Sequence, residues 1–437
     1  MSKLIFEYKK PQELDVVRHY TRLSQKNFSV DTVFYPLGSC TMKYNPKINE
    51  DTANLPGFTN IHPYQPADTV PGMIELLDEF KEMLSDIFGY DYFTLEPLAG
   101  AHGEFAAMLT IRNYFTAKSG TISRDEVIIP DSAHGTNPAS AKMAGFKVIT
   151  IPSTREGYID LEKLKDSVSE KTAALMLTNP NTLGLLEPNI KEIASLIHKK
   201  GGLLYYDGAN ANALIGKIKP GEIGFDIAHI NLHKTFSTPH GGGGPGSGPV
   251  GFKEFLKPYL PEKIATFHGN IQVIIKAYTY VKMQGEKGLS QISKKAKENA
   301  NYLKTKLQGY YDIPYPQECE HEFVISCADK KKQYGIRALD IAKRIIDYRF
   351  HPPTVYFPLI VPECLMIEPT ETESKETLDD FAAAMINIAK ECQATPELIK
   401  SAPHNTPVSR VDEVRAVKNP ILKSRGCREI NFTRNNS

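Results

Sequence analysis

The sequence has no tryptophan, and its six cysteines lack the spacing that metal sites and disulfide scaffolds show. No two of them form a CxxC or CxxH arrangement, which is the usual signature of a structural zinc site. Six cysteines in 437 residues are also few compared with a disulfide-linked secreted domain. We therefore expect no metal site and a reducing compartment, the cytoplasm.

An excess of charge of one sign and long apolar runs are also missing. Lys and Arg total 52 against 51 for Asp and Glu, so the net charge is +1. This balance argues against nucleic-acid partners and against binding to an anionic membrane surface. No run approaches the ~18 apolar residues of a membrane span, and residues 1–10 lack the apolar core of a signal peptide. The absences predict a soluble protein with no nucleic-acid or membrane partner.

What is present is a change of pattern along the chain, which predicts three regions. Residues 1–70 are rich in proline with little periodicity and predict an extended N-terminal arm. Residues 71–310 open with a helix over 72–88 and then alternate strands with helices, which predicts a large α/β domain. Residues 311–437 predict a smaller C-terminal α+β domain that ends in a polar tail.

The strands predicted in the middle region are short and almost entirely apolar. Such strands, separated by helices, are typical of a parallel sheet that is covered on both faces. In sheets of this kind, ligands bind beyond the carboxyl ends of the strands. The predicted strands span 126–130, 147–151, 172–178, 203–207 and 227–231.

Asp207 and Lys234 each come at the end of one of these strands, and this pair indicates pyridoxal phosphate (PLP) chemistry. A lysine forms a Schiff base with the PLP aldehyde, and a carboxylate pairs with the protonated pyridine nitrogen. The ring then acts as an electron sink for a carbanion. Each residue alone has an ordinary interpretation, as a surface lysine or a turn aspartate. Their placement at two strand ends favours the cofactor.

Other segments add candidate contacts for the same cofactor. Ala101 and His102 precede an apolar helix, where backbone amides bind phosphate. His134 follows a predicted strand, so its ring is a candidate to stack on the pyridine and to move protons. Either Asn179 or Asn181 is placed to bond the phenolic oxygen, and a turn asparagine is the alternative. The candidate cofactor-binding residues are Ala101, His102, His134, Asn181, Thr182, Asp207, His233 and Lys234.

The glycine-rich run that begins at His240 does not fit a nucleotide-binding loop. It contains no GxxxxGK[ST], and no GxGxxG lies between a strand and a helix. Pro245 and Pro249 remove backbone donors from the run. We interpret residues 241–251 as a loop that forms a wall beside Lys234.

The segment from Asn231 to His240, with the glycines that follow it, closely resembles the PLP-lysine signature of the glycine cleavage system P-protein family, glycine dehydrogenase (decarboxylating). That family occurs as one fused chain or as two half-length subunits. This chain resembles subunit 2, the half that carries the lysine. It departs from the family at His102, where we expect Gln, and in the tail from residue 424. Further similar segments are 35–50, 131–141, 178–187, 206–210, 351–358 and 367–379.

The resemblance implies the PLP-dependent fold-type I (aspartate aminotransferase-like) fold, with a large parallel-sheet domain and a smaller C-terminal one. It implies that Lys234 is the Schiff-base lysine, Asp207 the pyridinium partner and His134 the ring-stacking residue. The implied reaction decarboxylates glycine, moves the aminomethyl group to the lipoyl arm of H-protein and releases carbon dioxide. The implied partners are lipoylated H-protein and glycine dehydrogenase subunit 1, in a heterodimer of heterodimers.

Two other functions remain open from the sequence. Another fold-type I enzyme, an aminotransferase or an amino-acid decarboxylase, fits the same residues. An aminotransferase needs an arginine for the substrate carboxylate, and Arg337, Arg344 and Arg349 are available. A non-catalytic scaffold subunit of the same complex is the second alternative, and the intact Lys234 and Asp207 argue against it.

Overall fold

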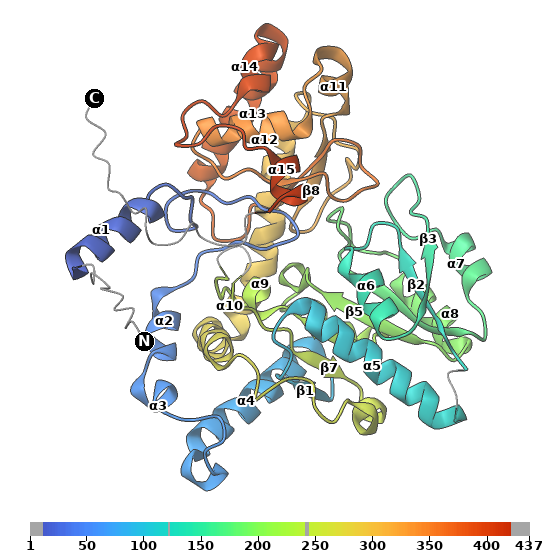
Figure 1. Cartoon of the computed structure of the whole chain (residues 1–437). Helices are drawn as coiled ribbons and strands as arrows, with labels where there is room; N and C mark the ends of the chain where they lie inside the picture. Colours follow the sequence, from blue (N-terminus) through green and yellow to red (C-terminus); the bar gives the residue numbers. More distant parts are fainter. Residues whose placement is uncertain (1–11, 121–122, 241–243, 421–437) are drawn as a thin grey trace, which may run out of the picture.

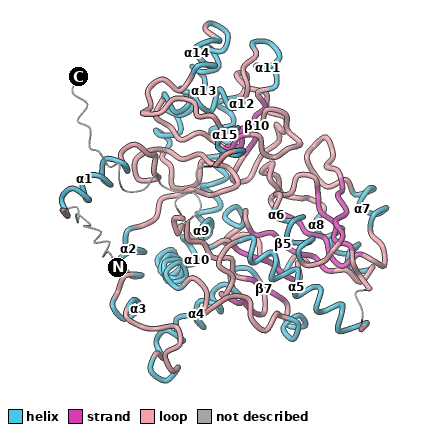
Figure 2. Tube along the Cα trace, in the orientation of Figure 1, coloured by secondary structure: helices cyan, strands magenta, loops and turns pink. Residues whose placement is uncertain are grey.

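The computed structural model describes residues 12–120, 123–240 and 244–420. Within them, a seven-stranded sheet forms the larger unit and a three-stranded sheet the smaller one (Figure 1). The large sheet has the order β1-β7-β6-β5-β4-β2-β3, and its strands are drawn magenta in Figure 2. The strands are β1 (Tyr92–Thr94), β2 (Glu126–Pro130), β3 (Lys147–Ile151), β4 (Thr172–Thr178), β5 (Leu203–Gly208), β6 (Ile227–Ile230) and β7 (Val250–Phe252).

The parallel α/β sheet predicted from the sequence is confirmed. Neighbouring strands from β3 to β6 pair in parallel, and every residue of β4 and β5 is buried, as their apolar composition requires. Strands β1 and β7 were not predicted; they pair antiparallel with each other, and β7 also pairs antiparallel with β6. Three-residue strands are too short to show a periodic pattern.

Helices cover both faces of the large sheet. On one face lie α5 (Gly100–Ser119) and α6 (Thr136–Met143). On the other lie α4 (Pro71–Phe88), α8 (Ile190–Lys199) and the first part of α10 (Ile271–Leu307). Two helices, α4 and α5, end at a glycine with positive φ, Gly89 at 75° and Gly120 at 70°, the conformation that glycine adopts without strain.

The smaller unit has an antiparallel sheet of β8 (Phe323–Ser326), β10 (Cys364–Ile367) and β9 (Thr354–Val355). Helices α12 (Ala338–Asp347), α13 (Lys375–Ala394) and α14 (Pro396–Ser401) pack on it. Helix α10 belongs to both cores, because Ile292 packs with the large sheet and Ala300 with the small unit. A domain boundary near residue 311 stays a prediction.

The N-terminal region contains helices that the sequence analysis did not predict. They are α1 (Glu13–Ser24), α2 (Lys47–Ala53) and α3 (Pro56–Thr59). Residues 35–46 are free of helix, as expected for an arm, and they run along both units. The Gly38 N–H donates to Met366 O in the small unit, and Lys43 Nζ donates to Thr235 O in the large one.

The remaining elements are short. They are α7 (Leu161–Ser167), α9 (Leu232–Thr235), α11 (Ala328–Tyr334), α15 (Glu413–Lys418) and the 3-10 turns η1 (Ala67–Thr69), η2 (Ala211–Ala213), η3 (Pro220–Glu222) and η4 (Glu254–Tyr259). Among the described residues, no helix is long and apolar enough to cross a membrane.

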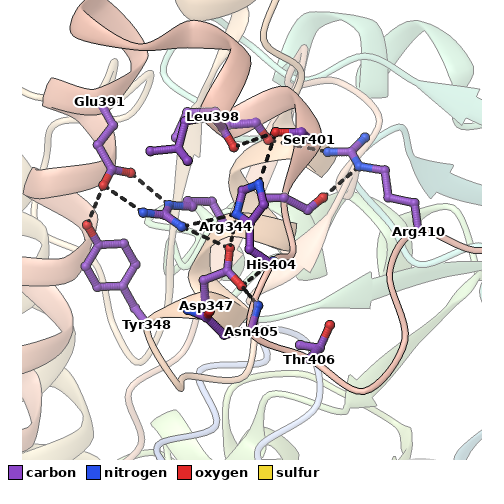
Figure 3. A network of polar contacts seen from close by, with 12 residues as sticks. Arg344, Asp347, Tyr348, Glu391, Leu398, Ser401, His404, Asn405, Thr406 and Arg410 are labelled. Atoms are coloured by element: carbon purple, nitrogen blue, oxygen red, sulfur yellow. Dashed lines mark hydrogen bonds and ion pairs between the residues drawn. The ribbon is translucent and has the colours of Figure 1, made fainter. Parts of the chain in front are cut away.

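The segment after α14 is tied to the small unit by a network centred on Asp347 (Figure 3). Its carboxylate accepts from the N–H groups of His404 and Asn405 at 2.6 and 2.8 Å and from Arg344 Nη1 at 3.0 Å. Arg344 also makes two 2.9 Å bonds to Glu391. Burial would raise the pKa of Asp347, but these donors hold it below the ordinary value.

Asp347→Asn is therefore expected to lower the free energy of unfolding by ~1–3 kcal/mol, because an amide nitrogen would face donors in a partly buried network. Thermal unfolding measures the loss, and Asp78→Asn, at an exposed pair with Lys81, is the control with a change within ~0.5 kcal/mol. A lowered pKa stabilises the fold above the ordinary Asp pKa of ~3.9 and stops doing so as the pH falls through the folded value. The difference in the free energy of unfolding between the wild type and Asp347→Asn should therefore become smaller in acid. Equal melting temperatures at pH 7 would contradict this role of Asp347.

Candidate active site

A cavity of about 210 Å³ opens at the carboxyl ends of β4, β5 and β6, where the sequence predicted a ligand site. Asp207 comes from β5 and Lys234 from α9, directly after β6. The loop after β2 supplies His134, and the start of α5 supplies Ala101. The structure thus brings the predicted catalytic residues together around one cavity.

Asp207 lies at the bottom of this cavity and is 1% exposed. Its Oδ2 accepts from Asn137 Nδ2 at 2.9 Å and from the Thr178 hydroxyl at 3.2 Å. Its Oδ1 accepts from the Ala209 N–H at 3.0 Å and lies 3.5 Å from His229 Nε2. Burial alone would raise the pKa of Asp207, but the adjacent His229 ring, the hydrogen bonds from Asn137 and the Ala209 N–H, and the charge of Lys234 lower it below the ordinary value. The carboxylate is therefore held ionised.

His229 contributes to this arrangement without carrying a full charge. It is completely buried, which lowers its pKa, and the charge of Lys234 lowers it further. Its Nδ1 bonds the Tyr205 hydroxyl at 2.5 Å, and its Nε2 bonds Asn231 Oδ1 at 2.8 Å. A neutral His229 leaves the negative charge of Asp207 free to balance a bound cation.

The N-terminal arm holds Lys234 at the other side of the cavity. Lys234 Nζ donates to Ser39 O at 2.8 Å, and Ser39 also lines the cavity. Ser39 has a φ of 62°, a left-handed conformation that is uncommon for a residue with a side chain. The Ser39 N–H donates to Glu322 Oε2 at 2.8 Å, which connects this turn to the small unit.

His134 and Glu104 lie at a third side of the cavity. The Thr136 hydroxyl oxygen stands 2.8 Å from both His134 Nδ1 and Glu104 Oε1. The ring of His134 makes an edge contact with Phe357 at 5.4 Å. Partial burial lowers the pKa of His134, and the charge of Lys234 lowers it further.

The N-terminus of α5 forms a close cradle at the remaining side. Gly100 and Ala101 line the cavity, and the first amides of a helix have no partner within the helix. A Cβ added at Gly100 would lie 2.3 Å from Asn231 Nδ2, so any larger residue would displace the Asn231 side chain. His233 lines the cavity beside it, and its Nδ1 accepts from the Ser247 N–H at 3.2 Å. Burial and Lys234 lower the pKa of His233 to about 3.

The side chains of two candidate cofactor-binding residues, His102 and Asn181, do not line the cavity. His102 turns away from the cavity, because its Nε2 bonds Ile264 O at 3.0 Å, and only its backbone remains available. Asn181 is also outside the lining. Its Nδ2 donates to Gly157 O at 2.7 Å and its Oδ1 accepts the N–H of Leu183. Asn181 therefore shapes its own loop.

The neighbours of Asn181 differ in their positions. Thr182 does line the cavity, and its hydroxyl donates to Ser132 O at 2.5 Å. Asn179 is fully buried, and its Oδ1 accepts the Glu187 N–H at 2.9 Å. Asn210, which the sequence analysis did not select, lines the cavity and donates to Pro180 O at 2.9 Å.

The donor set fits PLP. A buried ionised carboxylate, bonded only by neutral donors, suits a protonated pyridine nitrogen. A lysine lies on the same cavity for the aldehyde, and a helix N-terminus with a glycine cradle suits the phosphate. Part of the glycine-rich wall predicted over 241–251 lies outside the described residues, at 241–243. Gly246, within the described part, stands close to the ring of His233.

Comparisons with known proteins agree with this geometry. Residues 292–408 match the glycine dehydrogenase C-terminal domain, and residues 103–243 match the aminotransferase class-V domain. A glycine decarboxylase (P-protein) of the glycine cleavage system, in inhibitor-bound form, has a similar structure, with a TM-score of 0.74, 20% identity and coverage of 88% of this chain and 93% of that one. A NifS-like protein superimposes with a TM-score of 0.67 at 16% identity, over 82% of this chain and 100% of that one. The predicted fold-type I architecture is thereby confirmed.

Sequence relatives are much more similar. The chain is 57% identical to the probable glycine dehydrogenase (decarboxylating) subunit 2 of Caldanaerobacter subterraneus subsp. tengcongensis, with 94% of this chain and 89% of the relative covered. It is 56% identical to the protein of the same description from Thermotoga petrophila, over 95% of this chain and 91% of the relative. With such identity along nearly the full length of both chains, this protein belongs to the glycine dehydrogenase (decarboxylating) subunit 2 family.

Proposed function

We propose that the chain binds PLP in this cavity, decarboxylates glycine and transfers the remaining aminomethyl group to the disulfide of a lipoyl carrier protein. The observation that carries the proposal is the placement of Asp207 and Lys234 on one cavity, with the carboxylate held ionised. Family membership supports the same activity. When bound, PLP supplies an electron sink for the carbanion that remains after carbon dioxide leaves.

Different residues of the cavity would attach the cofactor, balance its charge and orient it. Lys234 would supply the amine that attaches the cofactor, and Asp207 would place a negative charge beside the pyridine nitrogen. The backbone at Ala101 and His102 binds the phosphate at the N-terminus of α5. His134 would stack on the ring and hold a proton near the reacting carbon, and Phe357 makes an edge contact with the His134 ring that would help to orient it.

An amino-transfer reaction fits the structure less well. An aminotransferase needs an arginine for the substrate carboxylate, and three were available in the sequence. Arg344 is engaged by Glu391 and Asp347, and Arg337 lies near Asp340 at the start of α12. Neither of them, nor Arg349, belongs to the described residues that line the cavity.

We propose partners from the same family membership. The expected assembly is a heterodimer of heterodimers with glycine dehydrogenase subunit 1, in the cytoplasm, served by lipoylated H-protein. The apolar surface of α1 supports a partner-binding site on the N-terminal arm. Helix α1 has no buried residue, and Val17 and Tyr20 are 54% and 66% exposed. A two-domain division near residue 311 is part of this proposal.

Product analysis with labelled glycine tests the proposed activity against amino transfer. The assembly with subunit 1 and lipoylated H-protein is expected to convert carboxyl-labelled glycine to labelled carbon dioxide. Offering a keto acid in place of the lipoyl carrier is expected to yield neither glyoxylate nor a new amino acid. Formation of glyoxylate at a rate similar to that of carbon dioxide release would contradict the proposal and favour an aminotransferase.

A further inference from the structure

The hydroxyl group of Thr136 links two titratable side chains of the cavity. Its oxygen lies 2.8 Å from His134 Nδ1 on one side and 2.8 Å from Glu104 Oε1 on the other. A hydroxyl has a single hydrogen, so it can donate to only one of these two atoms at a time. The direction of the two hydrogen bonds therefore depends on which group carries a proton.

A third contact decides this direction. The backbone N–H of Thr136 also points at His134 Nδ1, at 3.2 Å. Because an N–H only donates, Nδ1 has to present a lone pair, and the proton of the neutral imidazole is then on Nε2. The Thr136 hydroxyl can bond such an Nδ1 only by donating to it. An ionised Glu104 would take that hydrogen and leave two lone pairs facing each other across 2.8 Å.

The surroundings of Glu104 also favour its protonated form. Its side chain is 4% exposed, and its second oxygen, Oε2, accepts from the Ser140 hydroxyl at 3.1 Å. Burial and the charge of Asp207 raise the pKa of Glu104 to about 7, although the hydrogen bonds with Thr136 and Ser140 and the charge of Lys234 act in the opposite direction. The titratable groups around it are Asp207 and Tyr205 from β5, His229 from β6, Lys234 from α9 and His134 from the loop before α6.

We propose that Glu104 is the proton store of a relay in which its carboxyl O–H donates to Thr136 Oγ1, and the Thr136 hydroxyl donates to His134 Nδ1. This inference rests on the proposed function and names the residue that supplies a proton to His134 through Thr136. Glu104 acts through His134, so it is a positioning residue. The sequence analysis did not select it, because a glutamate inside a helix is most often a surface residue.

The relay moves one proton in each passage. His134 gives its Nε2 proton to the thiolate that forms when the lipoyl disulfide is cleaved, and its Nδ1 takes the proton of the Thr136 hydroxyl. Thr136 takes the proton of Glu104, which becomes a carboxylate. To reset the relay, His134 Nε2 takes one proton from solvent, Nδ1 returns its proton to Thr136, and Thr136 returns one to Glu104. The proton taken up by the thiolate is the one that the overall reaction consumes, so no further reactant is needed.

Two spectroscopic measurements on the cofactor-free protein test the relay without any turnover. NMR with 13C-labelled glutamate, assigned by the loss of a signal in Glu104→Gln, is expected to show Glu104 titrating near pH 7. Ordinary glutamate titrates near ~4.3. NMR with 15N-labelled histidine is expected to show His134 neutral at pH 7 with the proton on Nε2. A Glu104 midpoint below ~5, or a proton on Nδ1, would overturn the proposal.

Variants of the relay separate proton transfer from simple packing. Glu104→Gln still donates to Thr136 through its amide but has no proton to release, so the rate is expected to fall ~100-fold. Thr136→Val should behave in the same way, whereas Thr136→Ser keeps a hydroxyl and most of the rate. The wild-type rate should decline above pH 7 as Glu104 ionises, and this decline should disappear in Glu104→Gln and Thr136→Val.

The outcomes distinguish the relay from the function on which it rests. An unchanged pH profile in Glu104→Gln and Thr136→Val would mean that these residues only support the structure, and the relay would be wrong. If the NMR titration is as expected but wild-type protein with subunit 1 releases no carbon dioxide from glycine, the protonation of Glu104 stands. In that case the relay has no role in this reaction, and the proposed function fails.

Discussion

Lys234→Ala is expected to abolish the covalent attachment of PLP and to reduce glycine decarboxylation to background. The lysine-bound cofactor absorbs visible light, so the loss is read directly from the absorbance spectrum of protein mixed with PLP. Lys234 is the cavity's lysine among the described residues, and its ammonium group is fixed by Ser39 O. No other described lysine is placed to replace it.

The control for this variant is Lys282→Ala. Lys282 is half exposed, pairs with Glu79 and does not line the cavity. Its removal should leave both the absorbance and the rate unchanged. A Lys234→Ala protein that keeps the visible band and turns over glycine would show that another residue attaches the cofactor, and the assignment of the site would be wrong.

Asp207→Asn is expected to give the second-largest loss. Asparagine keeps the shape of the side chain but removes the charge that stabilises a protonated pyridine nitrogen. The loss of a buried electrostatic contact of this kind costs ~100- to 1,000-fold in rate. PLP should also bind more weakly. The amide of the variant has one acceptor oxygen in place of two, so the Asn137 amide, the Thr178 hydroxyl and the Ala209 N–H no longer fix the side chain beside the cofactor.

Asp131→Asn is the matched control for this charge. Asp131 also follows a strand of the large sheet, but its carboxylate bonds Ser153 by the N–H at 3.0 Å and the hydroxyl at 2.6 Å. It is not part of the cavity lining. A similar rate loss in the two variants would mean that Asp207 supports only the fold of the strand ends, and its electrostatic role would be refuted.

Most of the large sheet was predictable because its central strands β4, β5 and β6 are buried on both faces and its other parallel strands are also rich in apolar residues. The five strands between residues 126 and 231 read as short apolar runs, and each was found at its predicted position within one residue. Strands β9 and β10 of the small unit, which are two and four residues long, were not predicted, and neither were β1 and β7. Helix α1 was not predicted because it has no buried residues and therefore no apolar face that packs on a core.

The candidate site was predictable where it depends on strand ends. Asp207, Lys234 and His134 were placed by one rule, that polar residues after parallel strands meet at one edge of the sheet. Glu104 and Ser39 were not, because they come from a helix and an arm whose positions depend on tertiary packing. The side-chain positions of His102 and Asn181 could not be predicted, because each is fixed by a hydrogen bond to the backbone of a distant segment.

The release of carbon dioxide from carboxyl-labelled glycine, counted against the lipoyl disulfide consumed, tests the central claim most directly. The measurement uses this chain assembled with subunit 1, loaded with PLP and supplied with lipoylated H-protein. We expect one carbon dioxide for each lipoyl disulfide with the wild-type chain and none with Lys234→Ala. Carbon dioxide release that does not depend on the lipoyl group, or that survives in Lys234→Ala, would contradict the account.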